Sequence, residues 1–404
     1  VFDTPLMPAM DLLVNDLRAT LYRVDVFGTS DWPDPDGSLG PASLEPERLA
    51  ALYNGKIARR GWAMMRYLNS HGIKPYLTCS GIVPPWMCAA DANTLVDFDN
   101  FATMLVSLVD WAKNHEQLDF ELFGPMNETN LGRPEGPYVE PHAYARILEI
   151  LHRKLAERGL DDIRFVVAEE SGVSTRYMQE ILDCDAIERV AAWGMHTYGN
   201  PTPETYAAVR NLAGGIPVWM TEYGDLEQTG EREWLVAWLM TGRLFDLLEG
   251  GFRAAMVWDA YDNYHDHDEH WTIYGLIRTG LRAYTPKKRY FASKQVFRYV
   301  PPGFRRIAAS ASSADLRVLA FANEDSSKIT VVGMNDGDRT AYLNVDLKAV
   351  PAMILDERFA CYRTSATESC ARVADIPARG GNWPVRGIDA EIPPHTIFTL
   401  TNVD

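Results

Sequence analysis

The sequence predicts an α/β fold: a (β/α)8 TIM-type catalytic barrel over residues 1–289, with an additional C-terminal all-β sandwich domain over residues 290–404. Between residues 19 and 258, short apolar runs alternate with amphipathic helical segments, which is the pattern of right-handed βαβ units and a parallel sheet. From about residue 290, apolar and polar residues alternate between Asp, Asn and Gly turns, which is typical of a β-sandwich.

The apolar runs predict seven barrel strands, at residues 19–28, 74–80, 118–123, 164–168, 190–195, 218–220 and 254–258. Helices are expected at residues 6–17, 45–70, 97–114, 141–158, 175–182, 203–212 and 231–248. The chain opens on the helix that would follow a first strand, so one of the eight strands of such a barrel has no counterpart. Sandwich strands are expected at 316–323, 328–335, 340–347 and 396–402, with no helix after residue 290.

Composition and charge narrow the classes of function. The 404 residues are 47% hydrophobic, enough to bury a large core. The formal net charge of −16 argues against nucleic acid and anionic membranes as partners, because both require basic patches. No apolar run is long enough to span a membrane. The chain begins Val-Phe-Asp, so we expect a processed N-terminus and, with the acidic composition, a secreted or extracytoplasmic protein.

The five cysteines leave one question open. No C-x-x-C motif occurs, which argues against a structural zinc knuckle. Cys361 and Cys370 lie nine residues apart across a predicted hairpin. They are either a disulfide, if the compartment is oxidising, or two free thiols.

Two glutamates follow apolar runs at positions that suit catalysis. Glu128 follows the run at 118–123 in the sequence Gly-Pro-Met-Asn-Glu, and Glu222 follows the run at 216–220 in Thr-Glu-Tyr-Gly. Barrel enzymes place their chemistry at the carboxyl ends of parallel strands, so both side chains are expected at one cleft. Two carboxylates are the equipment for glycosidic bond hydrolysis: a separation of about 5–5.5 Å means retention of configuration, and about 6.5–9.5 Å means inversion. A single solvated glutamate at a strand end would carry no such meaning.

These motifs resemble those of the clan A glycoside hydrolases, and within that clan the chain is most similar to glycoside hydrolase family 30. The resemblance covers roughly residues 19–310, with the sandwich in outline. It rests on Arg23 in the second barrel strand, Asn127-Glu128 closing the fourth, His196 and Tyr198 after the sixth, Glu222 closing the seventh and Trp258 closing the eighth. The Pro84-Pro85-Trp86-Met87 loop and the stretch 290–303 are similar to that family's third-strand loop and its passage into the side sandwich.

The resemblance implies a retaining O-glycosidase that needs no cofactor. Glu128 would be the acid/base and Glu222 the nucleophile. Among the residues around the pair, Arg23 would keep Glu222 ionised, and His196 or Tyr198 would contact Glu222. Asn127 would contact the sugar 2-hydroxyl, and Trp258 would form the floor of the subsite that binds the non-reducing sugar. Trp86 and His265 are also expected to bind substrate. The substrate would be a glycoside, oligosaccharide or polysaccharide; the sugar, the linkage, exo or endo action and the oligomeric state stay open.

The stretch 259–271 departs from the family's usual pattern. It holds His265, His267 and His270 among several carboxylates, so it either ligates a metal, contacts the sugar or serves as scaffolding. A metal-dependent barrel enzyme using His265–His270 is therefore one alternative function, and a catalytically silent glycan-binding protein is another. Glu169 and Glu170 end the run at 164–168, and we expect them to be solvated rather than to line the cleft.

Overall fold

The computed structural model describes residues 7–26, 33–199, 201–226, 231–262, 273–279, 284–346, 357–379 and 387–403. The chain forms two compact units, each made of several segments. The barrel unit comprises Val1–Met7, Leu21–Gly224 and Asp246–Trp258, and the sandwich unit comprises Pro8–Thr20, Asp225–Phe245 and Asp259–Asp404. The predicted domain boundary, in contrast, is a single cut at residue 290.

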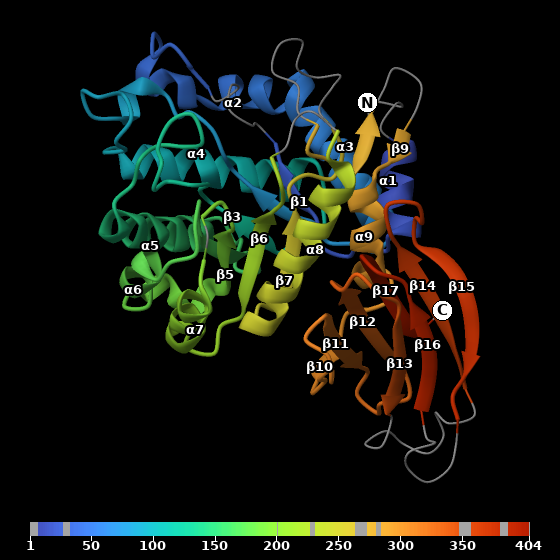
Figure 1. Ribbon diagram of the computed structural model, residues 1–404. Coiled ribbons are helices and arrows are strands. Elements are labelled where there is room, and N and C mark those ends of the chain that lie inside the picture. The colour runs from blue at the N-terminus through green and yellow to red at the C-terminus, as the bar shows by residue number, and fades with distance from the viewer. Residues whose placement is uncertain are drawn as a thin grey trace. The chain divides into compact units, whose positions relative to one another are not determined.

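The barrel unit is built on a seven-stranded parallel sheet whose strands follow one another in chain order (Figure 1). The strands are β1 (Arg23–Asp25), β2 (Tyr76–Thr78), β3 (Leu122–Gly124), β4 (Arg164–Glu170), β5 (Val190–His196), β6 (Val218–Tyr223) and β7 (Ala254–Val257). This confirms the seven predicted strands and the (β/α)8-like barrel core. Because every neighbour is parallel, the carboxyl ends of all seven strands lie along the same edge.

Helices connect these strands, as the sequence predicts. They are α2 (Pro46–Tyr53), α3 (Lys56–Ser70), α4 (Phe98–Asp110) with its extension η5 (Trp111–His115), α5 (Pro141–Glu157), α6 (Arg176–Ile181), α7 (Pro203–Leu212) and α8 (Glu233–Gly250). The single helix predicted over 45–70 is instead two, because Gly55 has an extended backbone with ψ of 162° and starts a new helix. Elsewhere the ends carry expected signals: Asp97 accepts the Asn100 amide at 3.2 Å, and Pro141 opens α5.

The interior of the barrel sheet is apolar away from its carboxyl edge. Tyr76, Val166, Ala192 and Met256 form a buried cluster, although they come from β2, β4, β5 and β7. Leu21, Leu122 and Trp219 pack against this cluster. Side chains of alternate residues on a strand point to the same face, so the strands that build this apolar layer also carry polar side chains further along.

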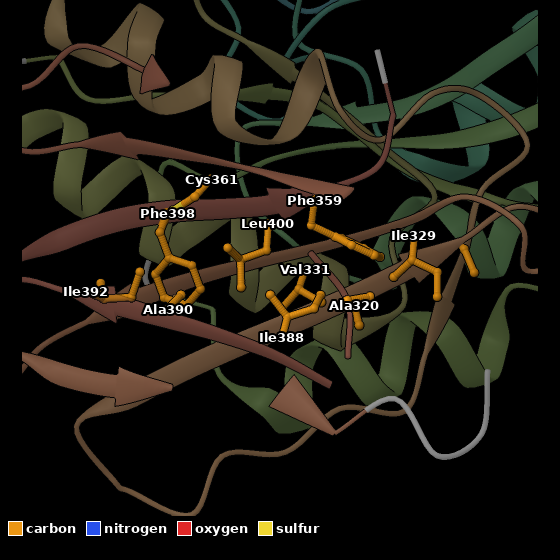
Figure 2. Packing of buried hydrophobic residues seen from close by; sticks show 12 residues of the cluster. Ala320, Ile329, Val331, Phe359, Cys361, Ile388, Ala390, Ile392, Phe398 and Leu400 are labelled. Carbon is orange, nitrogen blue, oxygen red and sulfur yellow. The ribbon is translucent and has the colours of Figure 1, made fainter. Parts of the chain in front are cut away.

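The sandwich unit packs two antiparallel sheets. One has the order β10-β11-β12-β17-β14-β15, and the other pairs β13 with β16. Their bounds are β10 (Arg305–Ile307), β11 (Leu316–Ala322), β12 (Ile329–Asn335), β13 (Ala341–Asp346), β14 (Arg358–Thr364), β15 (Ala371–Pro377), β16 (Gly387–Ile392) and β17 (Thr396–Thr401). Figure 2 shows Ile388, Ala390 and Ile392 of β16 facing Phe398 and Leu400 of β17. This period of two is the signature from which the sequence predicts a sandwich.

The helix α9 (Lys288–Phe297) crosses the predicted boundary, so the expectation of no helix after residue 290 is wrong. Most of its residues are buried, and its side chains bind within the sandwich unit: Gln295 donates to Thr364 at 2.8 Å and Lys294 to Asp16 at 2.6 Å. The same unit contains α1 (Met7–Asp11, from Pro8 on), η2 (Leu12–Asp16) and the hairpin of β8 (Ile277–Thr279) with β9 (Tyr284–Pro286).

All five cysteines are free thiols. Cys361 and Cys370 do flank a hairpin, that of β14 and β15, but Cys361 pairs in register with Ala374 and its side chain lies in the sandwich core. Burial raises the pKa of each of these two thiols to about 11. Of the two alternatives that the sequence leaves open, the structure shows the free thiols.

Candidate active site

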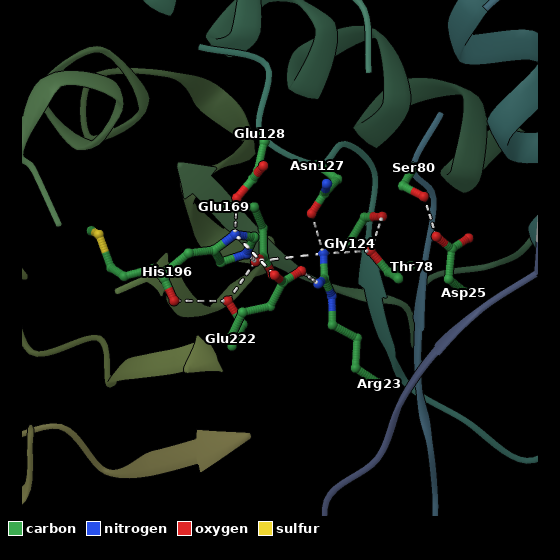
Figure 3. Close-up of polar contacts among 12 residues, drawn as sticks. Arg23, Asp25, Thr78, Ser80, Gly124, Asn127, Glu128, Glu169, His196 and Glu222 are labelled. Carbon is green, nitrogen blue, oxygen red and sulfur yellow. Dashed lines mark hydrogen bonds and ion pairs between the residues drawn. The ribbon is translucent and has the colours of Figure 1, made fainter. Parts of the chain in front are cut away.

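The predicted site residues converge at the carboxyl edge of the barrel sheet (Figure 3). Six of the seven strands contribute. Arg23 is the first residue of β1 and reaches the site with its side chain, as its bond to Glu222 shows. Thr78 ends β2, Asn127 and Glu128 follow β3, and Glu169, His196 and Glu222 lie in the last two residues of β4, β5 and β6. The structure therefore brings together side chains that are up to 199 residues apart in the chain.

Arg23 connects the nucleophile candidate to its neighbours. Its Nη1 donates to Oε1 of Glu222, and its Nη2 donates to Oδ1 of Asn127 at 2.7 Å. Nη2 also lies 3.4 Å from Oγ1 of Thr78. Burial alone would lower the pKa of this guanidinium, but the charges of Glu169 and Glu222 raise the pKa well above its ordinary value. Arg23 is thus a fixed positive charge beside Glu222.

His196 lies fully buried between three carboxylates. Its Nδ1 is 2.6 Å from Oε1 of Glu128 and 3.5 Å from Oε2 of Glu222, and its Nε2 is 2.9 Å from Oε2 of Glu169. Burial lowers the imidazole pKa, but the charge of Glu222 and the hydrogen bonds to Glu128 and Glu169 outweigh it, so the pKa rises to about 9. This pKa predicts an imidazolium at neutral pH.

Glu169 is the site residue that the sequence misplaces. It is expected to be solvated, yet its exposed fraction is 0%, and that of Glu170 is 5%. The pairing of β4 with β5 shifts register between Ala168 and Glu170, and Ala168 and Glu169 have positive φ of 77° and 48°. This bulge turns Glu169 toward His196, while Glu170 instead accepts from Ser174 at 2.6 Å.

The Glu169 carboxylate is held by several donors besides His196. The hydroxyls of Tyr76 and Thr221 donate to its two oxygens, and Nη2 of Arg23 lies 3.8 Å away. Burial would raise the pKa of Glu169, but the Arg23 charge and the His196 hydrogen bond lower it below the ordinary value. These donors favour the ionised form of Glu169. A pair of acidic residues closing an otherwise apolar strand is the one signal in the sequence that could have marked it.

Glu128 and Glu222 lie close together at the centre of the site. A carboxylate oxygen of each, with a ring nitrogen of His196, all lie within 4.8 Å of one another. Each glutamate is 6% exposed. The Tyr198 hydroxyl donates to Oε2 of Glu222 at 3.0 Å. Burial, and then the negative charge of Glu222, raise the pKa of Tyr198, so this hydroxyl stays a donor.

The backbone also positions Glu128. Its φ is +43°, in the left-handed region, and its amide donates to the carbonyl oxygen of Glu169 at 2.8 Å. A left-handed backbone at a residue with a Cβ costs roughly 1 kcal/mol or more, and such strain is found at functional sites. The bond to Glu169 holds Glu128 in this conformation, so the two acidic residues are coupled through the backbone as well as through His196.

Known proteins of similar structure identify the fold of this chain. No protein-family model matches the sequence. Among solved structures, a glycoside hydrolase family 30 subfamily 8 xylanase from Clostridium acetobutylicum aligns with 97% of this chain and 91% of its own, at a TM-score of 0.74 and 16% identity. The fold is that of the family 30 glycoside hydrolases.

Two further solved structures are similar to this chain over most of its length. The catalytic domain of a xylanase from Talaromyces cellulolyticus covers 100% of this chain and 93% of its own, with a TM-score of 0.75 and 16% identity. An endo-β-1,6-glucanase covers 95% of this chain and 83% of its own, with a TM-score of 0.67 and 15% identity. The clan A resemblance that the sequence predicts is thus confirmed at the level of the fold.

Three predicted residues remain: Trp258, Trp86 and His265. Trp258 follows β7, is 36% exposed, and its backbone amide donates to the Tyr223 carbonyl at 2.9 Å, so it lies at the same sheet edge of the family 30 fold. Trp86 lies in the turn η4 (Pro85–Met87), where its indole Nε1 is buried. His265 and the stretch His265–His270 lie outside the described residues.

Within the described part of the chain, Glu128, His196 and Glu222 are close enough to one another to hold a metal ion. Their present partners do not favour that reading. The guanidinium of Arg23 occupies an oxygen of Glu222, and both nitrogens of His196 are bonded to carboxylates. A divalent cation bound here would have to displace these hydrogen bonds. Among the described helices, none combines the length and apolar character needed to cross a bilayer.

Proposed function

We propose that this protein is a retaining glycoside hydrolase. The proximity of Glu128 and Glu222 at the carboxyl edge of the sheet carries the proposal. One oxygen of each lies within 4.8 Å of the other. This proximity is compatible with the separation of about 5–5.5 Å between the carboxyl groups of retaining enzymes. The family 30 fold supports the same assignment.

In this proposal each glutamate has its own role. Glu222 attacks the anomeric carbon, and Glu128 gives a proton to the leaving oxygen. In the second step Glu128 takes a proton from water, which attacks the same carbon and releases Glu222. Arg23 and Tyr198 bond different oxygens of Glu222, at Oε1 and Oε2, and so orient the carboxylate toward substrate.

The surrounding residues would bind the sugar. Asn127 is fixed through its Oδ1 by Arg23, which leaves its amide nitrogen to donate to a sugar hydroxyl. The partly exposed side chains of Tyr198 and Trp258 would stack on the apolar face of a sugar ring. We propose an oligosaccharide or polysaccharide as the substrate, in keeping with the formal net charge of −16 and with the xylanases and glucanase of similar fold.

The proposal is tested by removing the nucleophile. A panel of nitrophenyl glycosides and plant and microbial polysaccharides first identifies a substrate. Glu222→Ala is then expected to lower kcat/KM by about a thousandfold or more. Added azide should restore activity on a nitrophenyl glycoside and yield a glycosyl azide of the opposite anomeric configuration, detected by NMR.

Glu121→Ala is the matched control. Glu121 is an exposed glutamate beside β3 that pairs with Lys74 at the surface, so its loss should leave kcat/KM unchanged. If Glu222→Ala keeps kcat/KM within about tenfold of the unaltered protein, the assignment is wrong. Binding of glycans with no turnover of any substrate would favour a glycan-binding protein. Loss of activity with a chelator would favour the metal-dependent alternative based on His265–His270.

A further inference from the structure

Glu169, His196 and Glu128 form a hydrogen-bonded chain that the two-carboxylate mechanism does not use. The imidazole is fully buried, with Nε2 2.9 Å from Glu169 and Nδ1 2.6 Å from Glu128 (Figure 3). Glu169 is 0% exposed and Glu128 6% exposed. Groups so enclosed exchange protons with one another more readily than with bulk water.

The number of hydrogens limits the protonation states that Glu169, His196 and Glu128 can adopt. Each short N···O contact needs one hydrogen, so two contacts require two protons among the three side chains. Glu169 already accepts from Tyr76 and Thr221 and lies near Arg23, so it stays a carboxylate and the Nε2 proton points at it. The second proton lies between Nδ1 and Glu128, where either atom can hold it.

We propose that His196 stores the proton that Glu128 delivers to the leaving group, and that Glu169 is the positioning residue that keeps the proton in the site. This inference rests on the proposed function. In the resting protein the proton is on Nδ1 and Glu128 is a carboxylate. During the first step the Nδ1 proton moves to Oε1 of Glu128, which passes it to the glycosidic oxygen as Glu222 bonds to the anomeric carbon. In the second step the proton from water returns through Glu128 to Nδ1.

The electrostatics of the cluster favour this arrangement. Moving the proton from Nδ1 to Glu128 leaves the net charge of the buried cluster unchanged, so no new charge is buried. The groups that face the imidazole are Glu128, Glu169 and Glu222, with the Tyr198 ring edge-on at 6.1 Å. Arg23 neutralises Glu222 and approaches Glu169, and the net result is an imidazole pKa of about 9.

The first test separates proton delivery from structural support. Glu169→Gln keeps the size of the side chain but removes its charge. For an alkyl glycoside, whose leaving group needs a proton, kcat/KM should fall by about tenfold or more beyond any loss on the matching dinitrophenyl glycoside, which needs none. The basic limb of its pH profile should also move to lower pH. Glu170→Gln, on the same strand but bonded to Ser174, is the control and should show neither change.

The second test reads the proton directly and needs no substrate. Imidazole nitrogen NMR of the unaltered protein should show both His196 nitrogens protonated at neutral pH, and in Glu169→Gln the ring should lose its proton at lower pH. A neutral His196 ring at pH 7 in the unaltered protein would overturn the inference. So would equal losses of Glu169→Gln on both leaving groups with an unmoved pH profile. If no glycoside is hydrolysed but the His196 ring is an imidazolium, the proposed function is wrong, and with it the delivery of the proton to a leaving group. The holding of a proton by His196 would still be correct.

Discussion

Arg23 shows how one side chain can fix a site that is spread across a whole sheet. It donates to Glu222 and Asn127 from different nitrogens, and its guanidinium is planar and permanently charged. A lysine at this position would supply one compact charge and could not hold both partners in the same geometry. The side chain therefore contributes through shape as well as charge.

Arg23→Lys is expected to lower kcat/KM by about ten- to a hundredfold, mainly through kcat, because Glu222 and Asn127 lose their common support. The measurement is steady-state kinetics on the best substrate of the panel. Arg66→Lys is the control, since Arg66 pairs with Glu116 with half of its side chain exposed, and it should behave as the unaltered protein. Equal kinetics for the two variants would contradict the positioning role of Arg23.

At this scale the sequence predicts more of the site than it misses. The rule that strand ends meet along one edge predicts that Glu128 and Glu222 lie close together, and the family resemblance adds Arg23, Asn127 and His196. All five lie together in the structure. Glu169 escapes the rule because its direction depends on a bulge. One residue of slip decides whether a strand side chain faces the interior or the outside, and no local pattern reveals that slip.

Two strand glycines make room for the buried network. A Cβ on Gly194 of β5 would lie 2.6 Å from the carboxylate of Glu169, and a Cβ on Gly124 of β3 would lie 2.1 Å from the hydroxyl of Tyr76. Both distances are far below van der Waals contact. The glycines at positions 124 and 194 therefore leave the space in which Tyr76 and Glu169 meet.

Gly194→Ala should displace Glu169, lower the free energy of unfolding by about 1–3 kcal/mol through overpacking, and reduce kcat/KM. Thermal unfolding and kinetics measure the two effects. Gly172→Ala is the matched control, because a Cβ there meets nothing within 4 Å and its φ is not positive. An unchanged melting temperature and activity for Gly194→Ala would show that Glu169 can relocate without cost.

The elements themselves follow the sequence where the periodicity is long and uninterrupted. The strand and helix alternation is predicted throughout the barrel, whereas α9 is missed because it lies at the point where helical and strand patterns change over. The strand β16 is also missing from the sequence prediction, and β14 and β15 enter it only as a hairpin across Cys361 and Cys370, without bounds. β15 in particular is largely exposed, so its alternation of apolar residues is weak.

For the molecule as a whole, the buried imidazolium links stability to pH. His196 has an ordinary pKa of 6.5, and its surroundings raise the pKa to about 9 in the folded protein, so folding favours the protonated form. The resulting stabilisation is fully present below about pH 6.5 and is lost as the pH rises through about 9.

We expect the melting temperature to fall between neutral pH and about pH 9.5, and to fall less steeply in His196→Gln, in which this titration is absent. Other groups titrate in the same range, so the quantity to compare is the difference between the two slopes. Parallel slopes in the two proteins would contradict an elevated imidazole pKa.

The bond between Arg23 and Glu222 joins the first and sixth strands of the barrel sheet. A nascent chain released from the ribosome before residue 222 has the arginine but not its partner, and no fragment that lacks either strand can assemble the cluster. The proposed hydrolysis would therefore report complete assembly of this unit. When two separately produced halves are mixed, turnover would begin only once they have joined in the correct register.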